Sequence, residues 1–471
     1  MLRTKIICTL GPSTDDPEIM HALVEKGMNV ARLNFSHGTH EEQLVRLNKV
    51  RELREELKVP IGTILDTKGP EIRLMNFDGG KVKLTTGSKF TLTTEECLGT
   101  AERAAVNYID LPRDVKPGNQ ILMDDGKIAL TVRSISGTEI HCIVENDGVI
   151  SNKKSVNVPG VILTMPYISK KDYDDIIFGA KNGFDYIAAS FVRTADDVKE
   201  VRMLLNWNGG EHIKIIAKIE NLQGLQNFDQ ILEVSDGIMI ARGDMGVEMP
   251  LEEVPVIQKQ LIKKVFEGGK PVITATQMLE SMMSCPRPTR AEATDVANAI
   301  YDGTSAIMLS GETAAGKYPI EALQTMVRLA ERTESDIDYK KNFQKREFDI
   351  QGSVTHAISH AACTSAMELG AEAIVSFSMS GRTAQDVSAF RPNCRIIACT
   401  SSEITYNQLS LNWGVLAHMV KIENSLDALF DNGIQSIVDA GLVMPGDMLV
   451  VAAGVPIGVS GSTNFLKVTQ A

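Results

Sequence analysis

The 471-residue sequence predicts an α/β protein: a (β/α)8 TIM barrel with an inserted small β-barrel lid domain and a C-terminal α/β domain. Three observations support this fold class. Eight short apolar runs alternate with helix-like segments, as in a parallel barrel. One long interval carries alternating strand patterns in place of helices. A further βα pattern follows a charged segment. The length also corresponds to about three domains.

The eight predicted barrel strands are apolar throughout, as expected for parallel strands buried on both faces. Each ends in a turn that contains Gly or Asp, and most lead into a helical pattern. An open, doubly wound sheet is the alternative arrangement of the same units. In chain order the strands are Lys5–Leu10, Val30–Phe35, Gly62–Asp66, Tyr186–Phe191, Lys214–Glu220, Gly237–Ala241, Pro271–Ala275 and Ala306–Leu309.

The interval from Gly69 to about Met165 interrupts the barrel after its third strand. Stretches such as Lys81–Leu84, Phe90–Thr93 and Ile128–Ile135 alternate between apolar and polar residues, which indicates half-buried strands. The interval leaves the barrel at the C-terminal end of a strand, where barrel active sites form. We therefore expect it to act as a lid over the site.

The last part of the chain predicts a separate α/β domain. The charged segment Tyr339–Asp349 indicates a linker. A helix over Val354–Leu369 follows, with strands at Ala373–Phe377, Arg395–Thr400 and Met448–Ala453. The predicted domains are thus the barrel at 1–68 and 166–340, the lid at 69–165 and the C-terminal domain at 341–471.

Composition excludes several classes of function. The net charge of −12 argues against a protein that binds nucleic acid, because such proteins need a basic surface. Aromatic residues make up only 5%, too few for platforms that stack bases. The seven cysteines include no Cys-x-x-Cys pair, which favours free thiols in a reducing compartment. We expect a cytoplasmic protein with no membrane span, since the longest apolar stretch is too short and contains proline.

Charged residues stand at the C-terminal ends of several predicted strands. Lys218 and Glu220 share one face of their strand, because alternate residues of a strand point the same way. A barrel brings all these strand ends to one mouth. Carboxylates and cations together there favour a divalent cation beside a phosphate-bearing substrate, since Mg²⁺ takes one or two carboxylates plus substrate oxygens. Other polar residues at the mouth are Arg32, Asn34, Ser36, Asp66, Arg73, Asp244 and Thr276.

These residues by themselves leave two chemistries open. One is phosphoryl transfer, and the other is metal-assisted enolate chemistry such as an aldol cleavage. A single Lys-x-Glu pair is more often an ordinary ion pair, and a single Gly-Asp-x-Gly is more often a turn. The prediction therefore depends on the combination of residues at one mouth. A P-loop or Rossmann fingerprint does not occur in a suitable context.

The same strand ends resemble the pyruvate kinase family. The segment Ile213–Leu225 resembles the active-site signature of that family throughout, and the likeness continues along the whole chain in matching order. The resemblance implies transfer of the phosphoryl group of phosphoenolpyruvate to ADP, the last step of glycolysis. Some members carry a further C-terminal domain, which we expect this chain to lack. The other matching segments are Arg32–Gly38, Asp66–Arg73, Ala241–Asp244, Pro286–Glu292 and Met308–Ala314.

The resemblance implies a role for each residue at the mouth. Glu220 and Asp244 are similar to the ligands of the Mg²⁺ (or Mn²⁺) that holds substrate. Lys218 is similar to the cation that stabilises the phosphoryl group in flight, which suits a compact point charge. Thr276 is similar to the residue on the proton route from enolate to pyruvate. The implied substrate contacts are Arg32, Arg73, Gly243, Asp244 and Thr276, of which Arg73 grips the phosphate and the Gly243 backbone binds the carboxylate.

Two further sites are implied by the resemblance. A monovalent-cation site for K⁺ is similar to Asn34, Ser36, Asp66 and the carbonyl of Thr67, and a nucleotide site is similar to Asn34, His37, Arg73 and Lys154. Potassium-dependent members carry Glu at the position of Glu71, so we expect activation by potassium. Ser155 stands where the family usually has glycine, next to Lys154 in the lid.

A loop of the C-terminal domain resembles the family's effector-phosphate loop. Small hydroxyl residues and amides there suit an anion, so we expect a sugar bisphosphate, or a sugar monophosphate or nucleotide, as effector; a folded loop that binds no ligand is the alternative. The companion segment Ala453–Asn464 differs from the family pattern. The loop residues are Ser378, Ser380, Gly381, Arg382 and Thr383. The resemblance also implies a homotetramer.

Two other functions remain as alternatives. One is a metal-dependent lyase of the barrel type that acts on pyruvate or phosphoenolpyruvate. It would share the two carboxylates but would need neither a lid nor a nucleotide site. The other is a catalytically silent sensor of sugar phosphates, against which the intact set of Lys218, Glu220, Asp244 and Thr276 argues.

Overall fold

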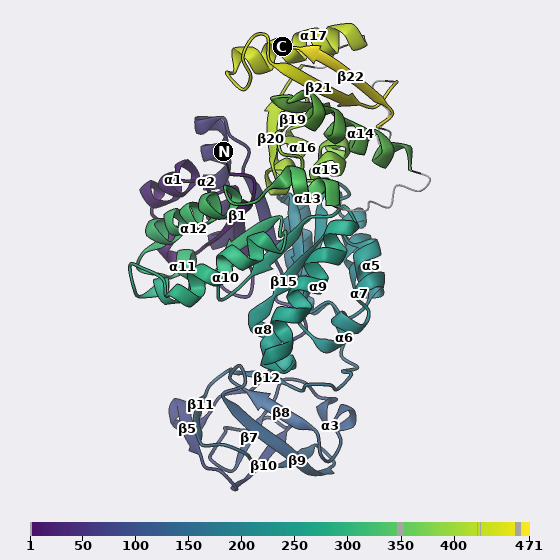
Figure 1. Ribbon diagram of the computed structural model, residues 1–471. Coiled ribbons are helices and arrows are strands. Elements are labelled where there is room, and N and C mark those ends of the chain that lie inside the picture. Colours follow the sequence, from purple (N-terminus) through teal and green to yellow (C-terminus); the bar gives the residue numbers. More distant parts are fainter. Residues whose placement is uncertain (1, 346–352, 422, 424, 457–462) are drawn as a thin grey trace.

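The computed structural model describes residues 2–345, 353–421, 423, 425–456 and 463–471, and it shows three units in a row (Figure 1). A closed barrel of parallel strands lies in the middle. An inserted unit of β strands lies at one end of the barrel, and the C-terminal unit lies at the opposite end. Within the described parts of the chain, every helix is too short or too polar to cross a bilayer.

The predicted barrel is confirmed, and the open sheet is excluded. All eight strands are present, and they close into one parallel sheet whose residues are almost all buried. Continuous apolar runs form these strands because one face packs into the barrel and the other under the helices. In order around the barrel they are β1 (Lys5–Leu10), β17 (Ala306–Leu309), β16 (Val272–Ala275), β15 (Gly237–Ala241), β14 (Lys214–Ile219), β13 (Tyr186–Ala189), β3 (Gly62–Asp66) and β2 (Val30–Asn34).

The barrel helices pack outside the strands and cover them with a large apolar core. Their ends are set by local signals. Asp16 caps α1 and Thr39 forms a capping box with Glu42 at the start of α2. The helices are α1 (Pro17–Glu25), α2 (His40–Leu57), α4 (Lys170–Lys181), α5 (Ala195–Trp207), α6 (Leu222–Gln226), α7 (Phe228–Val234), α8 (Arg242–Glu248), α9 (Val254–Glu267), α10 (Arg290–Tyr301), α11 (Gly311–Ala314) and α12 (Pro319–Glu334).

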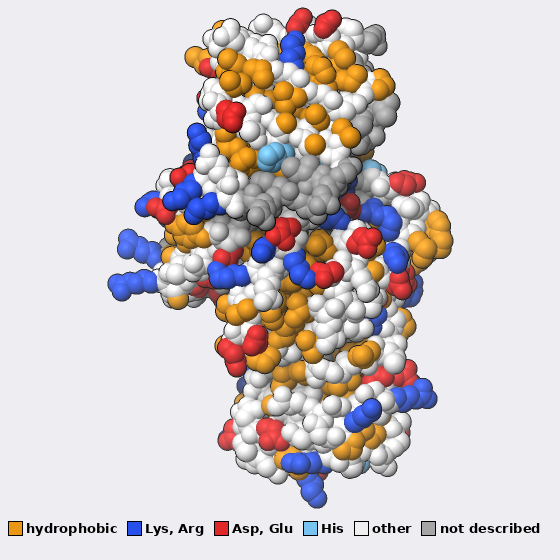
Figure 2. All heavy atoms as spheres, turned by 45° about the vertical axis from the view of Figure 1, so that its right-hand side comes forward, with side chains coloured by type: hydrophobic (Ala, Val, Ile, Leu, Met, Phe, Trp, Pro, Cys, Tyr) orange, Lys and Arg blue, Asp and Glu red, His pale blue; other side chains and the backbone are white. Residues whose placement is uncertain are grey.

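The inserted unit is a β structure with its own apolar core. It joins the barrel between β3 and α4, and Figure 2 shows a narrowed waist at this junction with hydrophobic side chains along it. Two sheets form it, together with the short helix α3 (Leu111–Asp114). The strands are β4 (Ile72–Arg73), β12 (Ser155–Asn157), β8 (Gln120–Met123), β9 (Ile128–Ser136), β10 (Glu139–Val144), β6 (Lys89–Thr93) and β7 (Arg103–Ala105) in one sheet, and β11 (Gly148–Ser151) and β5 (Lys81–Leu84) in the other.

The C-terminal unit is a five-stranded sheet between helices. The predicted helix and three strands are present with the expected ends. The strands β20 and β22 at the two edges were not expected from the sequence. The elements are α14 (Val354–Leu369), β18 (Ala373–Phe377), α15 (Arg382–Ala389), β19 (Arg395–Thr400), α16 (Glu403–Gln408), β20 (Val415–Met419), α17 (Leu426–Asp439), β21 (Met448–Ala453) and β22 (Phe465–Gln470).

The predicted linker Tyr339–Asp349 is wrong in its first part. Residues Tyr339–Lys345 form the helix α13, and residues 346–349 lie outside the described residues. Burial of Phe343 in the core of the C-terminal unit explains why this charged stretch is ordered as a helix.

The C-terminal unit closes the N-terminal end of the barrel. Leu411 belongs to the same apolar cluster as the side chains inside the barrel, and it is fully buried. Tyr186 of β13 donates a hydrogen bond to the carbonyl of Gln408 at 2.5 Å, and Lys5 of β1 donates one to the carbonyl of Val415 at 2.7 Å. The opposite end of the barrel, which faces the inserted unit, is therefore the end left open for a site.

Candidate active site

The predicted site residues at the barrel mouth come together around the side chain of Lys218. This residue lies near the C-terminal end of β14, and its side chain is only 9% exposed. Its Nζ lies 2.9 Å from Glu220 Oε1 and 3.1 Å from Asp66 Oδ1, and it donates a 2.8 Å hydrogen bond to Ser190 Oγ. Burial alone would lower the pKa of Lys218, but Asp66 and Glu220 raise it above its ordinary value. The ammonium is therefore a fixed positive charge.

Arg32 binds the second oxygen of the Asp66 carboxylate, whose first oxygen contacts Lys218. Its Nε donates to Asp66 Oδ2 at 2.7 Å, and its Nη1 donates to Thr9 Oγ1 at 2.9 Å. Burial opposes the charge on Asp66, but Arg32 and Lys218 outweigh it and lower the pKa of Asp66. Asp66 of β3 thus positions two cations at the mouth, Arg32 from the neighbouring strand β2 and Lys218 from β14, which lies beyond β13.

Glu220 and Asp244 form a pair of adjoining carboxylates. Glu220 follows β14 and is 1% exposed, whereas Asp244 lies in the first turn of α8. Glu220 Oε2 accepts a 2.6 Å hydrogen bond from the amide of Phe191. Burial, with a smaller contribution from Asp244, raises the pKa of Glu220 to about 7 against the opposing effect of Lys218. Burial is likewise the main cause that raises the pKa of Asp244.

This donor set fits a divalent cation. The buried carboxylate of Glu220 and the half-buried one of Asp244 repel each other, and a divalent cation between them would remove that repulsion. Among the described residues, these two are joined by no further His, Cys, Asp or Glu that would complete a group able to hold a metal by itself. An ion held here would take its remaining ligands from oxygens of a substrate or of water, which is the coordination that Mg²⁺ prefers.

Thr276 occupies a strained position next to Gly243. Its φ of 67° is a left-handed conformation that β-branched residues rarely adopt. Its hydroxyl donates to the Ala275 carbonyl at 2.6 Å and accepts from the Gly243 amide at 2.8 Å. Arg242 Nη2 donates to the Thr276 carbonyl at 2.7 Å. Backbone strain of this kind persists where the surrounding contacts over-determine it, and it gathers at functional sites.

The oxygens predicted for a monovalent cation lie on neighbouring strands. Asn34 of β2 and Asp66 of β3 are partners in the parallel register, and Ser36 follows two residues later. Asn34 Oδ1 accepts a 3.0 Å hydrogen bond from the Ser36 amide. The carbonyl of Thr67 accepts a 2.6 Å hydrogen bond from Ser190 Oγ. These four residues therefore belong to one corner of the mouth.

The inserted unit brings Arg73 and Lys154 to the opposite wall. Arg73 lies on β4 and not at the end of a barrel strand, and it makes a two-pronged ion pair with Glu71 at 2.9 and 3.0 Å. Lys154 Nζ pairs with Asp124 Oδ1 at 2.9 Å. Both cations are partly exposed, so pairs of this kind contribute little to stability and can exchange partners.

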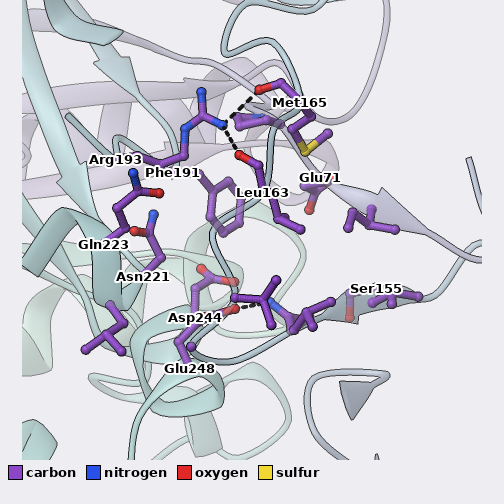
Figure 3. A pocket seen from close by; sticks show the side chains of 18 of the residues that line it. Glu71, Ser155, Leu163, Met165, Phe191, Arg193, Asn221, Gln223, Asp244 and Glu248 are labelled. Atoms are coloured by element: carbon purple, nitrogen blue, oxygen red, sulfur yellow. Dashed lines mark hydrogen bonds between the residues drawn. The ribbon is translucent and has the colours of Figure 1, made fainter. Parts of the chain in front are cut away.

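A cavity of about 400 Å³ separates these two walls, and Figure 3 shows Asp244 and Glu248 of α8 on one side of it with Glu71 and Ser155 on the other. A volume of this size suits a small-molecule ligand. His37 is exposed and does not line the cavity. Predicted site residues that do line it are Arg73, Lys154 and Asp244.

Several residues of the site were not found from the sequence. Ser190 contacts Lys218 and Asp66, Phe191 contacts Glu220, and Arg242 supports Thr276. The position of Ser190 at the end of an apolar strand is the signal that would have found it. Phe191 acts through its amide and carries no signal in its side chain. Arg193 follows on the same loop and lines the cavity.

The predicted effector loop lies at the C-terminal end of β18, before α15. Gly381 has a φ of 73° and precedes the first helical residue, Arg382, which pairs with Asp386 at 2.9 Å. Ser378 and Ser380 lie between strand and helix. Thr383 Oγ1 lies 2.8 Å from Thr463 Oγ1, which ties the loop to the start of the last strand segment. Residues 457–462 of the companion segment lie outside the described residues.

Comparisons with known proteins agree along the whole chain. Residues 1–323 match the family model of the pyruvate kinase barrel domain, and residues 356–469 match that of the pyruvate kinase alpha/beta domain. A pyruvate kinase of Clostridium acetobutylicum is 50% identical over 469 residues, which cover 99% of each chain. One of Geobacillus stearothermophilus is 50% identical over 99% of this chain and 80% of its own length.

A solved structure is similar throughout. The crystal structure of a pyruvate kinase from Cryptosporidium parvum matches with a TM-score of 0.93 at 39% identity. The match covers 100% of this chain and 96% of that one. Sequence and structure comparisons therefore agree on barrel, inserted unit and C-terminal unit together. The chain belongs to the pyruvate kinase family of phosphotransferases.

Proposed function

We propose that this chain transfers the phosphoryl group of phosphoenolpyruvate to ADP and so produces pyruvate and ATP. The observation that carries the proposal is the buried ammonium of Lys218, held 2.9 Å from Glu220 and 3.1 Å from Asp66 at the mouth of the barrel. Phosphoryl transfer needs mainly positioning and neutralisation of charge. A fixed cation beside two carboxylates that suit a metal supplies both.

Glu220 and Asp244 would hold Mg²⁺ or Mn²⁺ in this proposal. The bound ion would supply positive charge to the oxygens of the substrate. Lys218 adds a second positive charge that cannot move away, because Glu220, Asp66 and Ser190 hold its Nζ. Preorganised charge of this kind is most effective in a site from which water is excluded.

Arg73 would bind the phosphate from the side of the inserted unit. A guanidinium makes two parallel hydrogen bonds to a carboxylate, as Arg73 does to Glu71, and the same geometry fits phosphate oxygens. Arg32 contributes positive charge from the barrel side of the site, where Asp66 holds its guanidinium. The backbone of Gly243 would bind the substrate carboxylate. Asp244 would contribute to the same contact through the metal ion that it holds.

Thr276 would take part in moving a proton to the enolate that is left after transfer. Its hydroxyl already makes two short hydrogen bonds, at 2.6 Å to Ala275 and 2.8 Å from Gly243, so it is fixed in direction. A hydroxyl in such a position moves a proton directly or through a bound water. The left-handed backbone of Thr276 supports this role, because strained backbone gathers at functional sites, and Phe191 and Gln277 also have positive φ.

The nucleotide would lie between the barrel and the inserted unit, in contact with Asn34, His37, Arg73 and Lys154. The ion pair of Lys154 with Asp124 is partly exposed, which lets Lys154 turn to a phosphate. Potassium would bind the oxygens of Asn34, Ser36, Asp66 and Thr67. Carboxylate, amide, hydroxyl and carbonyl oxygens are suitable ligands for such a hard cation.

We further propose that a phosphorylated effector binds the loop Ser378–Thr383 of the C-terminal unit and that the chain assembles into a homotetramer. The loop supports this because Ser380 is exposed and Gly381 leaves backbone amides free to approach an anion at the start of α15. Titrating sugar bisphosphates, sugar monophosphates and nucleotides while recording the phosphoenolpyruvate saturation curve tests the effector. Sedimentation velocity tests the assembly.

One assay tests the reaction itself. The protein is mixed with phosphoenolpyruvate, ADP, Mg²⁺ and potassium, and pyruvate and ATP are measured together. We expect the two products in equal amounts. Pyruvate without ATP would instead favour a lyase, and no reaction would favour a silent sensor; either result would reject the proposal.

A further inference from the structure

The inserted unit is connected to the barrel by two crossings of the chain, and the two are held differently. At the outgoing crossing, the buried carboxylate of Asp172 accepts hydrogen bonds from the amides of Lys68 and Gly69 at 3.1 and 3.0 Å. At the returning crossing, the side chain of Arg193 binds the backbone. Both anchors belong to the barrel, so the position of the inserted unit is set by barrel side chains.

Arg193 holds the returning crossing through its guanidinium. Nη1 donates to the carbonyl of Met165 at 2.9 Å and makes a longer contact with that of Leu163 at 3.5 Å, and Figure 3 shows both. Arg193 Nε pairs with Asp197 Oδ2 at 3.3 Å. The central carbon of the guanidinium lies 5.6 Å from the ring centre of Tyr167. The side chain is only 16% exposed. These contacts fix its direction in the cavity wall.

The loop that carries Arg193 is itself rigidly mounted. Asn227 donates to the carbonyl of Arg193 at 2.9 Å, and Asn221 donates to that of Val192 at 3.4 Å. A side chain at Gly224 would collide with the same Val192 carbonyl, so α6 packs against this loop at backbone distance. Arg193 is therefore fixed relative to the barrel, and the returning crossing that it binds is fixed relative to the barrel as well.

The same loop also contacts the catalytic residues. Its first residue, Ser190, accepts a hydrogen bond from Lys218, and its second, Phe191, donates one to Glu220 at 2.6 Å. Tyr167, just beyond the returning crossing, donates to the carbonyl of Ser190 at 3.0 Å. One loop of four residues, 190–193, thus touches Lys218, Glu220 and the end of the inserted unit.

We propose that Arg193 is a positioning residue that sets the inserted unit over the barrel mouth by holding the carbonyls of the returning crossing. This inference rests on the proposed function, because its benefit is to place Arg73 and Lys154 opposite Lys218. Without the anchor, the inserted unit occupies the productive position for a smaller fraction of the time. The apparent affinity for the nucleotide then falls by that fraction.

The test compares Arg193→Ala with a matched control in the same helix region, Arg202→Ala. Arg202 also binds one backbone carbonyl, that of Ile213 at 2.6 Å, and one carboxylate, that of Asp236. All of these partners belong to the barrel. Both variants lose a partly buried arginine, but only Arg193→Ala loses a contact with the returning crossing.

Three measurements are made on the full-length variants: hydrogen exchange of the amides in residues 161–167, the nucleotide KM, and Mn²⁺ affinity in the absence of turnover. For Arg193→Ala we expect exchange in 161–167 to rise at least about fivefold and the nucleotide KM to rise about tenfold, with Mn²⁺ affinity unchanged. Arg193→Lys should be intermediate, because lysine keeps the charge but not the fork. Arg202→Ala should leave all three values near those of the parent.

Unchanged exchange in Arg193→Ala would overturn the inference, and so would an equal rise in Arg202→Ala. A parent chain that fails to make ATP from phosphoenolpyruvate and ADP would count against the proposed function alone. The exchange comparison would still decide the role of Arg193, because it needs no turnover.

Discussion

Two buried lysines lie at opposite ends of the same barrel, and their pKa values are shifted in opposite directions. Lys218 lies at the mouth with Glu220 at 2.9 Å and Asp66 at 3.1 Å. Lys5 lies at the base, where its Nζ donates to the Val415 carbonyl at 2.7 Å. Both are less than one tenth exposed. The comparison separates the effect of burial from the effect of charged partners.

Burial lowers the pKa of Lys5 to about 8, and Glu334 opposes this only in part. Burial acts in the same direction on Lys218, but its two carboxylates more than compensate and raise its pKa. A buried lysine of this barrel thus keeps its charge at alkaline pH where carboxylates in direct contact outweigh burial, as they do at Lys218. The mouth is built to keep a cation, and the base contains a lysine that serves the junction with the C-terminal unit.

The largest expected effect contrasts the two lysines directly. Lys218→Met should lower the kcat for ATP formation by about 10³-fold or more, because the charge that neutralises the phosphoryl group is lost. Lys5→Met should change kcat by less than about threefold, because its side chain lies at the other end of the barrel. A coupled assay measures both. Mn²⁺ binding by Lys218→Met, expected to be largely intact, shows that the site is still folded.

The second prediction concerns stability against pH at the base. In the folded chain Lys5 loses its proton near pH 8, whereas an exposed lysine does so near 10.5. Between these values the unfolded chain holds one more proton, so the free energy of unfolding rises with pH by up to about 3 kcal/mol on account of Lys5. Urea unfolding of the parent and of Lys5→Met at pH 7.5 and pH 10 measures this difference. Equal pH dependence in both would show that Lys5 does not carry it.

The third prediction concerns potassium at the mouth. Glu71 is the residue that potassium-dependent members of the family carry, and here it pairs with Arg73 at 2.9 Å. We expect at least about tenfold activation by potassium, since a bound cation adds positive charge beside the transferred group. Rates are compared in sodium-free buffer with and without potassium. Equal rates would reject this role.

The smallest effect on catalysis is expected from a substitution in the inserted unit, at Lys154 in the wall of the cavity. Lys154 is 39% exposed, against 9% for Lys218. Lys154→Met should raise the nucleotide KM about fivefold and change kcat less, because an exposed lysine contributes mainly to binding. Lys127→Met is the matched control, since Lys127 also pairs with Asp124 but does not line the cavity. A similar rise in KM in both variants would show that the effect comes from Asp124.

The sequence was sufficient for the barrel and for most of its mouth. Strands buried on both faces are continuous apolar runs, so β1, β3, β15 and β17 could be predicted to the residue. The edge strand β22 could not, because it mixes polar with apolar residues, whereas β20 is apolar except for His418 and was missed although its pattern is that of a strand. Charged residues at strand ends identified Lys218 and Glu220. Ser190 carried such a signal at the end of an apolar strand, whereas Arg193 could not be identified, because its partners include backbone carbonyls that are far away in the sequence.

The central claim is that a cation fixed by carboxylates at the barrel mouth supports phosphoryl transfer. The most direct test measures pyruvate and ATP together from phosphoenolpyruvate and ADP in the parent, Lys5→Met and Lys218→Met. We predict equal amounts of both products from the parent and from Lys5→Met, and a loss of both in Lys218→Met. Near-normal ATP formation by Lys218→Met, or pyruvate without ATP from the parent, would contradict the claim.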